Sequence, residues 1–150
     1  MRVRAATPRD GLGIADLIGR AAPPHFDTKG YAQGHWPDGA VVLVAVDAGH
    51  VVGWLEGVLD GVYAGPGAPA PPPHGYILAV VVDPDWRQLG VGSALVEAFV
   101  RMARAEEISW VFLVPKRGGH APEKVEFFRG CGFTPVDDLG EEVTALGRWT

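Results

Sequence analysis

The sequence contains a single cysteine, Cys131, among its 150 residues. One cysteine cannot form an intramolecular disulfide, and it argues against a zinc site built from cysteines. Long apolar runs are also missing, since none reaches the roughly 18 residues that a membrane-spanning helix needs. The charged start of the chain is not followed by an apolar signal core. We therefore expect a cytoplasmic protein with no membrane partner and no metal site.

Positive charge is scarce as well. The chain has 13 Lys and Arg against 18 Asp and Glu, which gives a net charge of −5. This balance argues against general nucleic-acid binding. An anionic cofactor would have to be held locally by oriented amides and a few cations, whereas a cationic substrate would be weakly favoured by the overall field.

The composition that remains is globular, with 47% hydrophobic and 21% charged residues, and the length predicts one domain over residues 1–150. Apolar periodicity and turn residues predict an α/β (α+β) fold. Strands are expected at 2–6, 41–46, 51–59, 76–82, 110–114, from 133 and at 143–149, and helices after Thr7-Pro8, around 27–34, at 95–105 and at 123–131.

These elements predict a mixed sheet of about six or seven strands with helices on both faces. The apolar run 76–82 is typical of a central strand that is buried on both faces. The strand–helix–strand order through residue 114 predicts a right-handed crossover onto a parallel neighbour. On the helix after Pro8, an apolar stripe is expected to be buried, formed by Leu12, Ile14, Ala15, Leu17 and Ile18.

Two irregular segments allow more than one interpretation. Residues 22–40 carry large aromatic side chains, which would form either a lid or substrate wall, or fold back onto the core. Residues 64–75 are rich in proline and are expected to be an exposed, semi-rigid insertion in a hairpin. The alternative for this second segment is a polyproline ligand for a partner protein.

The stretch from Asp83 to Leu95 is the strongest functional signal. It joins a strand to a helix and contains Gly90 and Gly92, which leave backbone N–H groups at the helix start uncovered. Such a place binds phosphate. A Walker motif is excluded because no Gly-Lys-Ser/Thr follows, and the dinucleotide fingerprint is excluded because Leu95 stands where its third glycine would be.

This stretch resembles the acetyl-coenzyme A signature of the GNAT N-acetyltransferase superfamily, Arg/Gln-x-x-Gly-x-Gly/Ala. The residues that carry the resemblance are Val80-Val81-Val82-Asp83-Pro84 and Trp86-Arg87-Gln88-Leu89-Gly90-Val91-Gly92-Ser93-Ala94-Leu95. The late segment Phe127-Phe128-x-x-x-Gly132-Phe133 is similar to a second family pattern, and the element order agrees over essentially the whole chain. The resemblance implies the mostly antiparallel sheet of the GNAT fold.

The resemblance also implies a set of cofactor-binding residues. The amides of the turn would bind the coenzyme A pyrophosphate with help from Arg87, and the strand at Val80, Val81 and Val82 would run beside the pantetheine arm. One N–H group of that strand would polarise the thioester carbonyl. Phe128, which stands where many family members have a catalytic tyrosine, is included in this set. The turn residues concerned are Gln88, Leu89, Gly90, Val91, Gly92 and Ser93.

Proton transfer is the less defined half of the chemistry. Glu56 is the first candidate base, because it shares a strand face with Trp54 and Val58, and apolar surroundings disfavour the charged form of a carboxylate. Asp83 and His74 follow, although Asp83 would also serve as a turn cap and His74 as an exposed loop residue. Phe128 cannot donate a proton, so the acid would be His120, Tyr31, Cys131 or water, or the thiolate would leave unaided. Cys131 is equally well explained as a small packing residue.

The sequence therefore predicts an acetyl-CoA-dependent N-acetyltransferase acting on a primary amine of a small molecule or protein. A cationic acceptor is a mild preference, and a homodimer is common among similar proteins. The alternatives are a degenerate module that binds coenzyme A as a sensor or interaction domain, which the phenylalanine at 128 would suit, and transfer of a longer acyl group. The sequence does not identify the acceptor.

Overall fold

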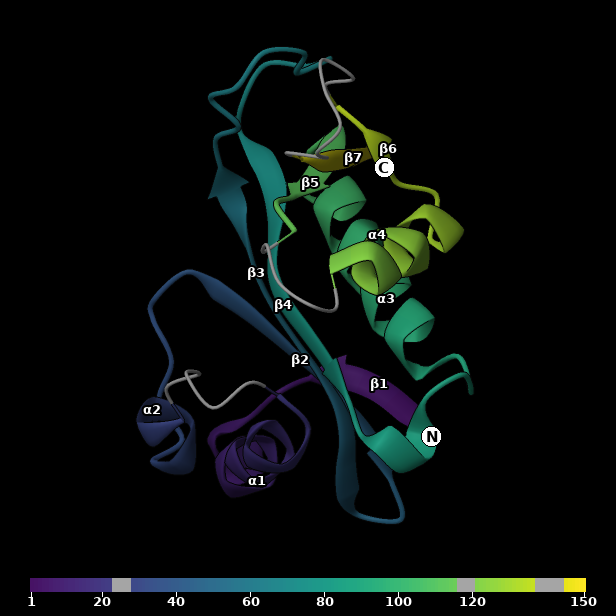
Figure 1. Ribbon diagram of the computed structural model, residues 1–150. Coiled ribbons are helices and arrows are strands. Elements are labelled where there is room, and N and C mark those ends of the chain that lie inside the picture. Colours follow the sequence, from purple (N-terminus) through teal and green to yellow (C-terminus); the bar gives the residue numbers. More distant parts are fainter. Residues whose placement is uncertain (23–27, 116–120, 137–144) are drawn as a thin grey trace. The chain divides into compact units, whose positions relative to one another are not determined.

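The computed structural model describes residues 1–22, 28–115, 121–136 and 145–150. Two short 3-10 helices, labelled η, accompany the helices and strands of Figure 1. In chain order the elements are β1 (Arg2–Ala5), η1 (Pro8–Asp10), α1 (Gly11–Ala21), α2 (Lys29–Ala32), β2 (Ala40–Asp47), β3 (His50–Gly61), β4 (His74–Val82), η2 (Pro84–Trp86), α3 (Val91–Ala105), β5 (Trp110–Leu113), α4 (Ala121–Gly130), β6 (Thr134–Pro135) and β7 (Leu146–Trp149).

Within these described ranges the strands form a seven-stranded sheet in the order β1-β2-β3-β4-β5-β7-β6. β1 with β2, β5 with β7 and β6 with β7 are antiparallel pairs, and β4 with β5 is a parallel pair. The predicted mixed, mostly antiparallel sheet is confirmed. The parallel neighbour expected after the crossover helix is confirmed too, since α3 connects β4 to β5.

By their internal contacts the residues divide into two compact units, Met1–Gly57 with Ala79–Phe99 and Val58–Leu78 with Val100–Thr150. The prediction of one domain over residues 1–150 stays a prediction. Arg20, Tyr31, Glu56 and residues 80–93 lie in the first unit, whereas His74 and Phe128 lie in the second. The helices of the described ranges include none with the length and apolar character to cross a membrane.

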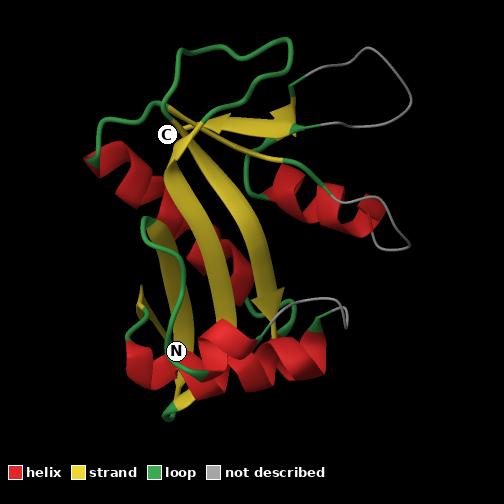
Figure 2. Ribbon diagram, turned by 90° about the vertical axis from the view of Figure 1, so that its left-hand side faces the viewer, coloured by secondary structure: helices red, strands yellow, loops and turns green. Residues whose placement is uncertain are grey.

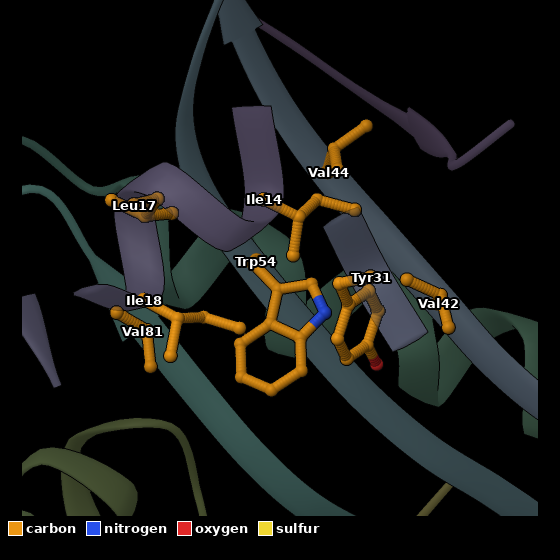
Figure 3. Close-up of a cluster of buried hydrophobic side chains, with 8 residues drawn as sticks. All are labelled: Ile14, Leu17, Ile18, Tyr31, Val42, Val44, Trp54 and Val81. Carbon is orange, nitrogen blue, oxygen red and sulfur yellow. The ribbon is translucent and has the colours of Figure 1, made fainter. Parts of the chain in front are cut away.

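In the first unit, α1 and α2 cover one face of the strands. Figure 3 shows their apolar side chains meeting those of β2, β3 and β4 around the Trp54 ring. Apolar residues recur at helical spacing along α1, so burying one side of it removes a continuous stripe from water. The cluster consists of Ile14, Leu17, Ile18, Tyr31, Val42, Val44, Trp54 and Val81.

One member of the predicted α1 stripe is misplaced. Leu12 is 73% exposed, although Ile14, Leu17 and Ile18 are buried. Helical geometry puts Leu12 about 200° from Ile14 around the axis, so the two cannot face the same strands. The prediction that Leu12 is buried is wrong.

The start of α3 covers the opposite face of the same strands. A Cβ added to Gly53 would lie 2.7 Å from Val91 Cγ1 and 3.0 Å from Leu95 Cδ1, so the missing side chain lets α3 approach β3 closely. The neighbouring residue, Trp54, points to α1 and α2. The predicted alternation along β3 is therefore confirmed, and Figure 2 shows strands passing between helices.

The second unit contains an aromatic cluster on β4 and β5. Tyr76 stacks on Phe112 with 4.5 Å between ring centroids, and the His74 ring meets the edge of Trp110 at 5.1 Å. β4 is not buried along its whole length, however, because Leu78 is 44% exposed. The prediction of a strand covered on both faces therefore fails at Leu78.

The proline-rich loop before β4 is anchored by one buried side chain. His74 Nδ1 accepts a bond of 3.1 Å from the Tyr63 amide, and Nε2 lies 2.8 Å from the Ala70 carbonyl oxygen. Pro66, Pro69 and Pro71 to Pro73 are exposed, as predicted. The backbone bends at 65, 69, 70 and 72, and these bends argue against the extended polyproline ligand that was the alternative.

Candidate active site

The turn between β4 and α3 lies at the surface of the first unit. Residues 87–90 are exposed and lead directly into Val91, the first residue of the 15-residue helix α3. Gln88 and Gly90 have φ values of 63° and 84°. When residues with a positive φ alternate with residues that have a negative φ, successive amides lie on one side of the chain and form an anion-binding concavity. The local geometry therefore agrees with the expected phosphate-binding turn.

Gly90 is the residue whose lack of a side chain matters most in this turn. An ideal Cβ on Gly90 would have no heavy atom within 4 Å, so the space beside the backbone is open. The first amides of α3 have no partner within the helix and lie at the positive end of its dipole. Arg87 adds an exposed guanidinium to the same turn. Open space, oriented amides and one cation are the features that a pyrophosphate requires.

The end of β4 leads into this turn. Val81 packs into the α1 cluster, whereas Val80 and Val82 are half-buried. The ladder between β4 and β5 joins Gly75 to Val111 and Tyr76 to Phe112, and in the described residues it stops there. The β4 backbone at 80–82 therefore has an edge that β5 does not pair, which is what an extended pantetheine arm needs.

Asp83 is held by four hydrogen bonds. Its amide donates to the Val52 oxygen at 2.9 Å, and its carbonyl oxygen accepts from the Trp86 amide at 2.8 Å. Its Oδ1 accepts from the Asp85 amide, and its Oδ2 accepts from Arg20 Nη1, both at 2.9 Å. These bonds fit the capping role considered for Asp83, because both carboxylate oxygens already have partners.

Glu56 lies on β3 beside Tyr31 of α2. The Tyr31 hydroxyl donates a hydrogen bond to Glu56 Oε1, so a buried phenol orients the half-buried carboxylate. The Tyr31 ring stacks on Trp36 at 5.8 Å between centroids and meets Trp54 edge-on at 5.3 Å. Figure 3 shows the Tyr31 ring directly beside the Trp54 indole. Tyr31 and Trp36 thus fold back onto the core, which is one of the two interpretations of the aromatic segment.

The surroundings of Tyr31 determine what it can do chemically. Burial raises its pKa above the ordinary value, and the hydrogen bond to Glu56 acts in the same direction, against a smaller opposing effect of Trp54. Tyr31 therefore keeps its proton at any ordinary assay pH. A hydroxyl that is bound to Glu56 and difficult to ionise is better suited to positioning the carboxylate than to protonating a leaving group.

The remaining catalytic candidates are not brought to Glu56 by any described contact. Phe128 is buried and packs edge-on against Phe127 and Phe133, with centroids 4.9 and 5.6 Å away. Cys131 is buried, in agreement with a packing role. His120 and the acidic residues Asp137 and Asp138 lie outside the described residues.

The prediction that His74 is an exposed loop residue is wrong. It is 1% exposed and forms the first residue of β4, which begins two residues earlier than expected. Because Nδ1 accepts an N–H, the proton sits on Nε2 and is donated to Ala70. Both nitrogens are used inside the second unit, so His74 is not a candidate base.

Sequence reasoning did not single out Arg20, and it considered Tyr31 only as a candidate acid and not as a partner of Glu56. Arg20 and Asp83 are 63 residues apart in the chain, and Tyr31 and Glu56 are 25 apart, so no local motif links either pair. The weak signal was the arginine in the last turn of an amphipathic helix. Over the described ranges, no three His, Cys, Asp or Glu side chains are grouped as a metal site would need.

Comparisons with known proteins agree with this geometry. The family model described as the acetyltransferase (GNAT) family matches residues 13–133. A mycothiol acetyltransferase of Nocardiopsis dassonvillei is 30% identical over 137 residues, which are 91% of this chain and 37% of that protein. The chain thus spans well under half the length of this relative. The family that the sequence resembles is confirmed.

Solved structures support the fold. The GNAT domain of S. lividans PAT has a TM-score of 0.76 at 22% identity, covering 99% of this chain and 90% of that one. An aminoglycoside 6'-N-acetyltransferase complexed with coenzyme A has a TM-score of 0.73 at 15% identity, covering 99% and 97%. The expected acyltransferase fold is confirmed. The individual site residues are not tested by these likenesses.

Proposed function

The chain belongs to the acetyltransferase (GNAT) family, and on that premise we propose that it is an enzyme that transfers an acetyl group from acetyl-CoA directly to a primary amine. The observation that carries the proposal is the exposed turn 87–90, with its two left-handed residues, at the start of α3. The amides of residues 88–93 would hold the pyrophosphate, and Arg87 would neutralise part of its charge. Acetyl-CoA is accordingly the cosubstrate.

The reaction forms an N–C bond to the acetyl carbonyl carbon and breaks the thioester C–S bond, while one proton moves from nitrogen to the departing sulfur. A backbone N–H of residues 80–82 would stabilise the charge that develops on the carbonyl oxygen. Glu56 would accept the proton of the attacking amine, directly or through a water. Tyr31 supports this role, because its hydroxyl holds the Glu56 carboxylate in one orientation.

Elimination among the described groups reduces the number of candidates for the proton donor to sulfur. Asp83 and His74 are fully engaged elsewhere, and the Tyr31 hydroxyl is bound to Glu56. Phe128 has no proton to give, and its proposed part is packing beside the cofactor. His120, water, or departure of the thiolate without help remain as proposals, since a thiol with a pKa near 8.5 is a tolerable leaving group.

We propose a cationic amine as the acceptor, carried by a small molecule or a protein. The support is the net charge of −5 together with the carboxylate of Glu56. A homodimer and a cytoplasmic location also stay predictions. Mycothiol acetyltransferase is the name of a much longer relative, so it suggests an amine to test and no more.

A binding and turnover experiment tests the function. Acetyl-CoA should raise the melting temperature of the wild type, and thiol release should accompany acetylation of at least one amine in a panel. Gly90→Glu should abolish the thermal shift, because it fills the open space with a negative side chain. The matched control is Gly49→Glu, since Gly49 also has a positive φ, 81°, and no atom within 4 Å of its ideal Cβ. Binding without turnover of any amine would favour the sensor or interaction module, and no binding would contradict the proposal.

A further inference from the structure

We propose that Arg20 is a positioning residue for the cofactor-binding turn, acting through Asp83. The inference rests on the proposed function, because it concerns the same turn. Arg20 would do two things: fix the residue from which the turn begins, and neutralise a carboxylate that would otherwise compete with the cofactor for Arg87. Neither role follows from the family signature, which does not include α1.

The first role follows from the hydrogen bonds. Asp83 is 9% exposed and connects β3, η2 and α1 through its amide, carbonyl and carboxylate groups. Arg20 supplies the bond to α1, with 2.9 Å between Nη1 and Asp83 Oδ2. Its Nε donates to Asp16 Oδ2 at 3.0 Å, one helical turn earlier. The planar guanidinium thus has an acidic partner at Nη1 and another at Nε, and this geometry favours one orientation of the Asp83 carboxylate.

The second role follows from the charges. The Arg20 hydrogen bond holds the pKa of the Asp83 carboxyl below its ordinary value, and the Asp85 amide and the charge of Arg87 act in the same direction. Asp83 is therefore an anion at neutral pH, only four residues before Arg87. With Arg20 removed, Arg87 would be the remaining cationic partner of Asp83 among these groups, and Arg87 would then neutralise less of the negative charge of the cofactor.

Steady-state kinetics of the full chain test the inference. Arg20→Met should raise KM for acetyl-CoA about tenfold, which corresponds to about 1.4 kcal/mol of binding. The kcat and the KM for the amine should stay close to wild-type values, because Glu56 and Tyr31 do not contact Arg20 in any described bond. Arg2→Met is the matched control, since Arg2 is an exposed arginine of β1 that makes none of these bonds.

A double variant separates the charge argument from a simple loss of structure. Asn is a good N-cap residue, so Asp83→Asn keeps an acceptor for the Asp85 amide while removing the charge. Arg20→Met combined with Asp83→Asn should recover most of the lost affinity for acetyl-CoA. Arg20→Lys, which keeps the charge without the planar fork, should show a smaller loss than Arg20→Met.

The outcomes distinguish this inference from the proposed function. If the wild type neither binds nor turns over acetyl-CoA, the proposed function fails. If the wild type is active and Arg20→Met has an unchanged KM, or the double variant binds as weakly as Arg20→Met, the inference alone is overturned. Melting temperatures measured without acetyl-CoA identify any variant that fails to fold. If Arg20→Met is such a variant, the KM of Arg20→Lys for acetyl-CoA is compared with that of the wild type instead.

Discussion

Tyr31 is a buried hydroxyl that contacts the carboxylate of Glu56, the residue proposed as the base. Its ring is 6% exposed, between Trp36 and Trp54, and its hydroxyl donates to Glu56. We predict that Tyr31→Phe lowers kcat about tenfold, since a hydrogen bond to a charged group is worth about 1.5–3 kcal/mol. The KM for acetyl-CoA should not change. The control is Tyr76→Phe, which keeps the aromatic stack on Phe112; a wild-type kcat for Tyr31→Phe would contradict the positioning role.

Asp10 carries the clearest pH dependence of stability. Arg4 donates to both of its carboxylate oxygens at 2.7 and 2.9 Å, and the Thr7 amide donates at 2.8 Å. The bond from Arg4, first among these, holds the pKa of Asp10 below its ordinary value. The folded-state pKa is therefore below the unfolded one, so the stabilisation is complete above about pH 4 and is lost as the pH falls through the folded-state value.

We predict that Asp10→Asn lowers the free energy of unfolding by about 2 kcal/mol at pH 7. The difference from wild type should shrink as the pH falls below about 4 and through the lowered folded-state pKa, because the wild-type carboxyl then takes up its proton. Urea unfolding at several pH values measures the loss of unfolding free energy at pH 7 and its dependence on pH. Asp38→Asn, at an exposed carboxylate, is the control. A loss that is the same at every pH would show that the ion pair is not its cause.

At the scale of elements, the distance between β3 and α3 decides where the helix start lies. Gly53→Ala would put a methyl group 2.7 Å from Val91 Cγ1. We predict a loss of about 1–3 kcal/mol of stability and a weaker Kd for acetyl-CoA, because displacing Val91 moves the first amides of α3. Calorimetric titration with coenzyme A measures the Kd.

The control for this change is a glycine that has no close neighbour. Gly19 of α1 has no atom within 4 Å of its ideal Cβ, so Gly19→Ala should be neutral or slightly stabilising. An unchanged Kd in Gly53→Ala would mean that α3 does not have to approach β3 this closely for cofactor binding.

For the whole molecule, net charge is the property with a direct consequence. A chain with a charge of −5 attracts a cationic acceptor from a distance, and salt screens this attraction. Raising the ionic strength from about 50 to about 300 mM should raise KM for a cationic amine about twofold and leave KM for a neutral amine unchanged. Equal salt dependence for both amines would contradict a role of the overall field.

Local patterns were enough to predict most elements and the turn between β4 and α3, which we propose as the phosphate site. The alternation of side chains along β3 predicted that Glu56 and Trp54 share a face of the strand. The glycines after β4 indicated an anion site. Both predictions depend only on residues that are close together in the chain. The observed strand bounds differ from the predicted ones by a few residues where tertiary hydrogen bonds extend a strand. His74 is the example, since its ring bonds to Tyr63 and Ala70 made an expected loop residue the buried start of β4.

What the sequence by itself determined is therefore the order of the elements, the family resemblance and the turn at residues 87–90. Only the tertiary structure decided which distant side chains bond to Asp83, before that turn, and to Glu56. Arg20 reaches Asp83 across 63 residues and Tyr31 reaches Glu56 across 25. The physical reason is that periodicity specifies which face of an element is apolar, whereas the partner of a polar side chain is set by the packing of whole elements against one another.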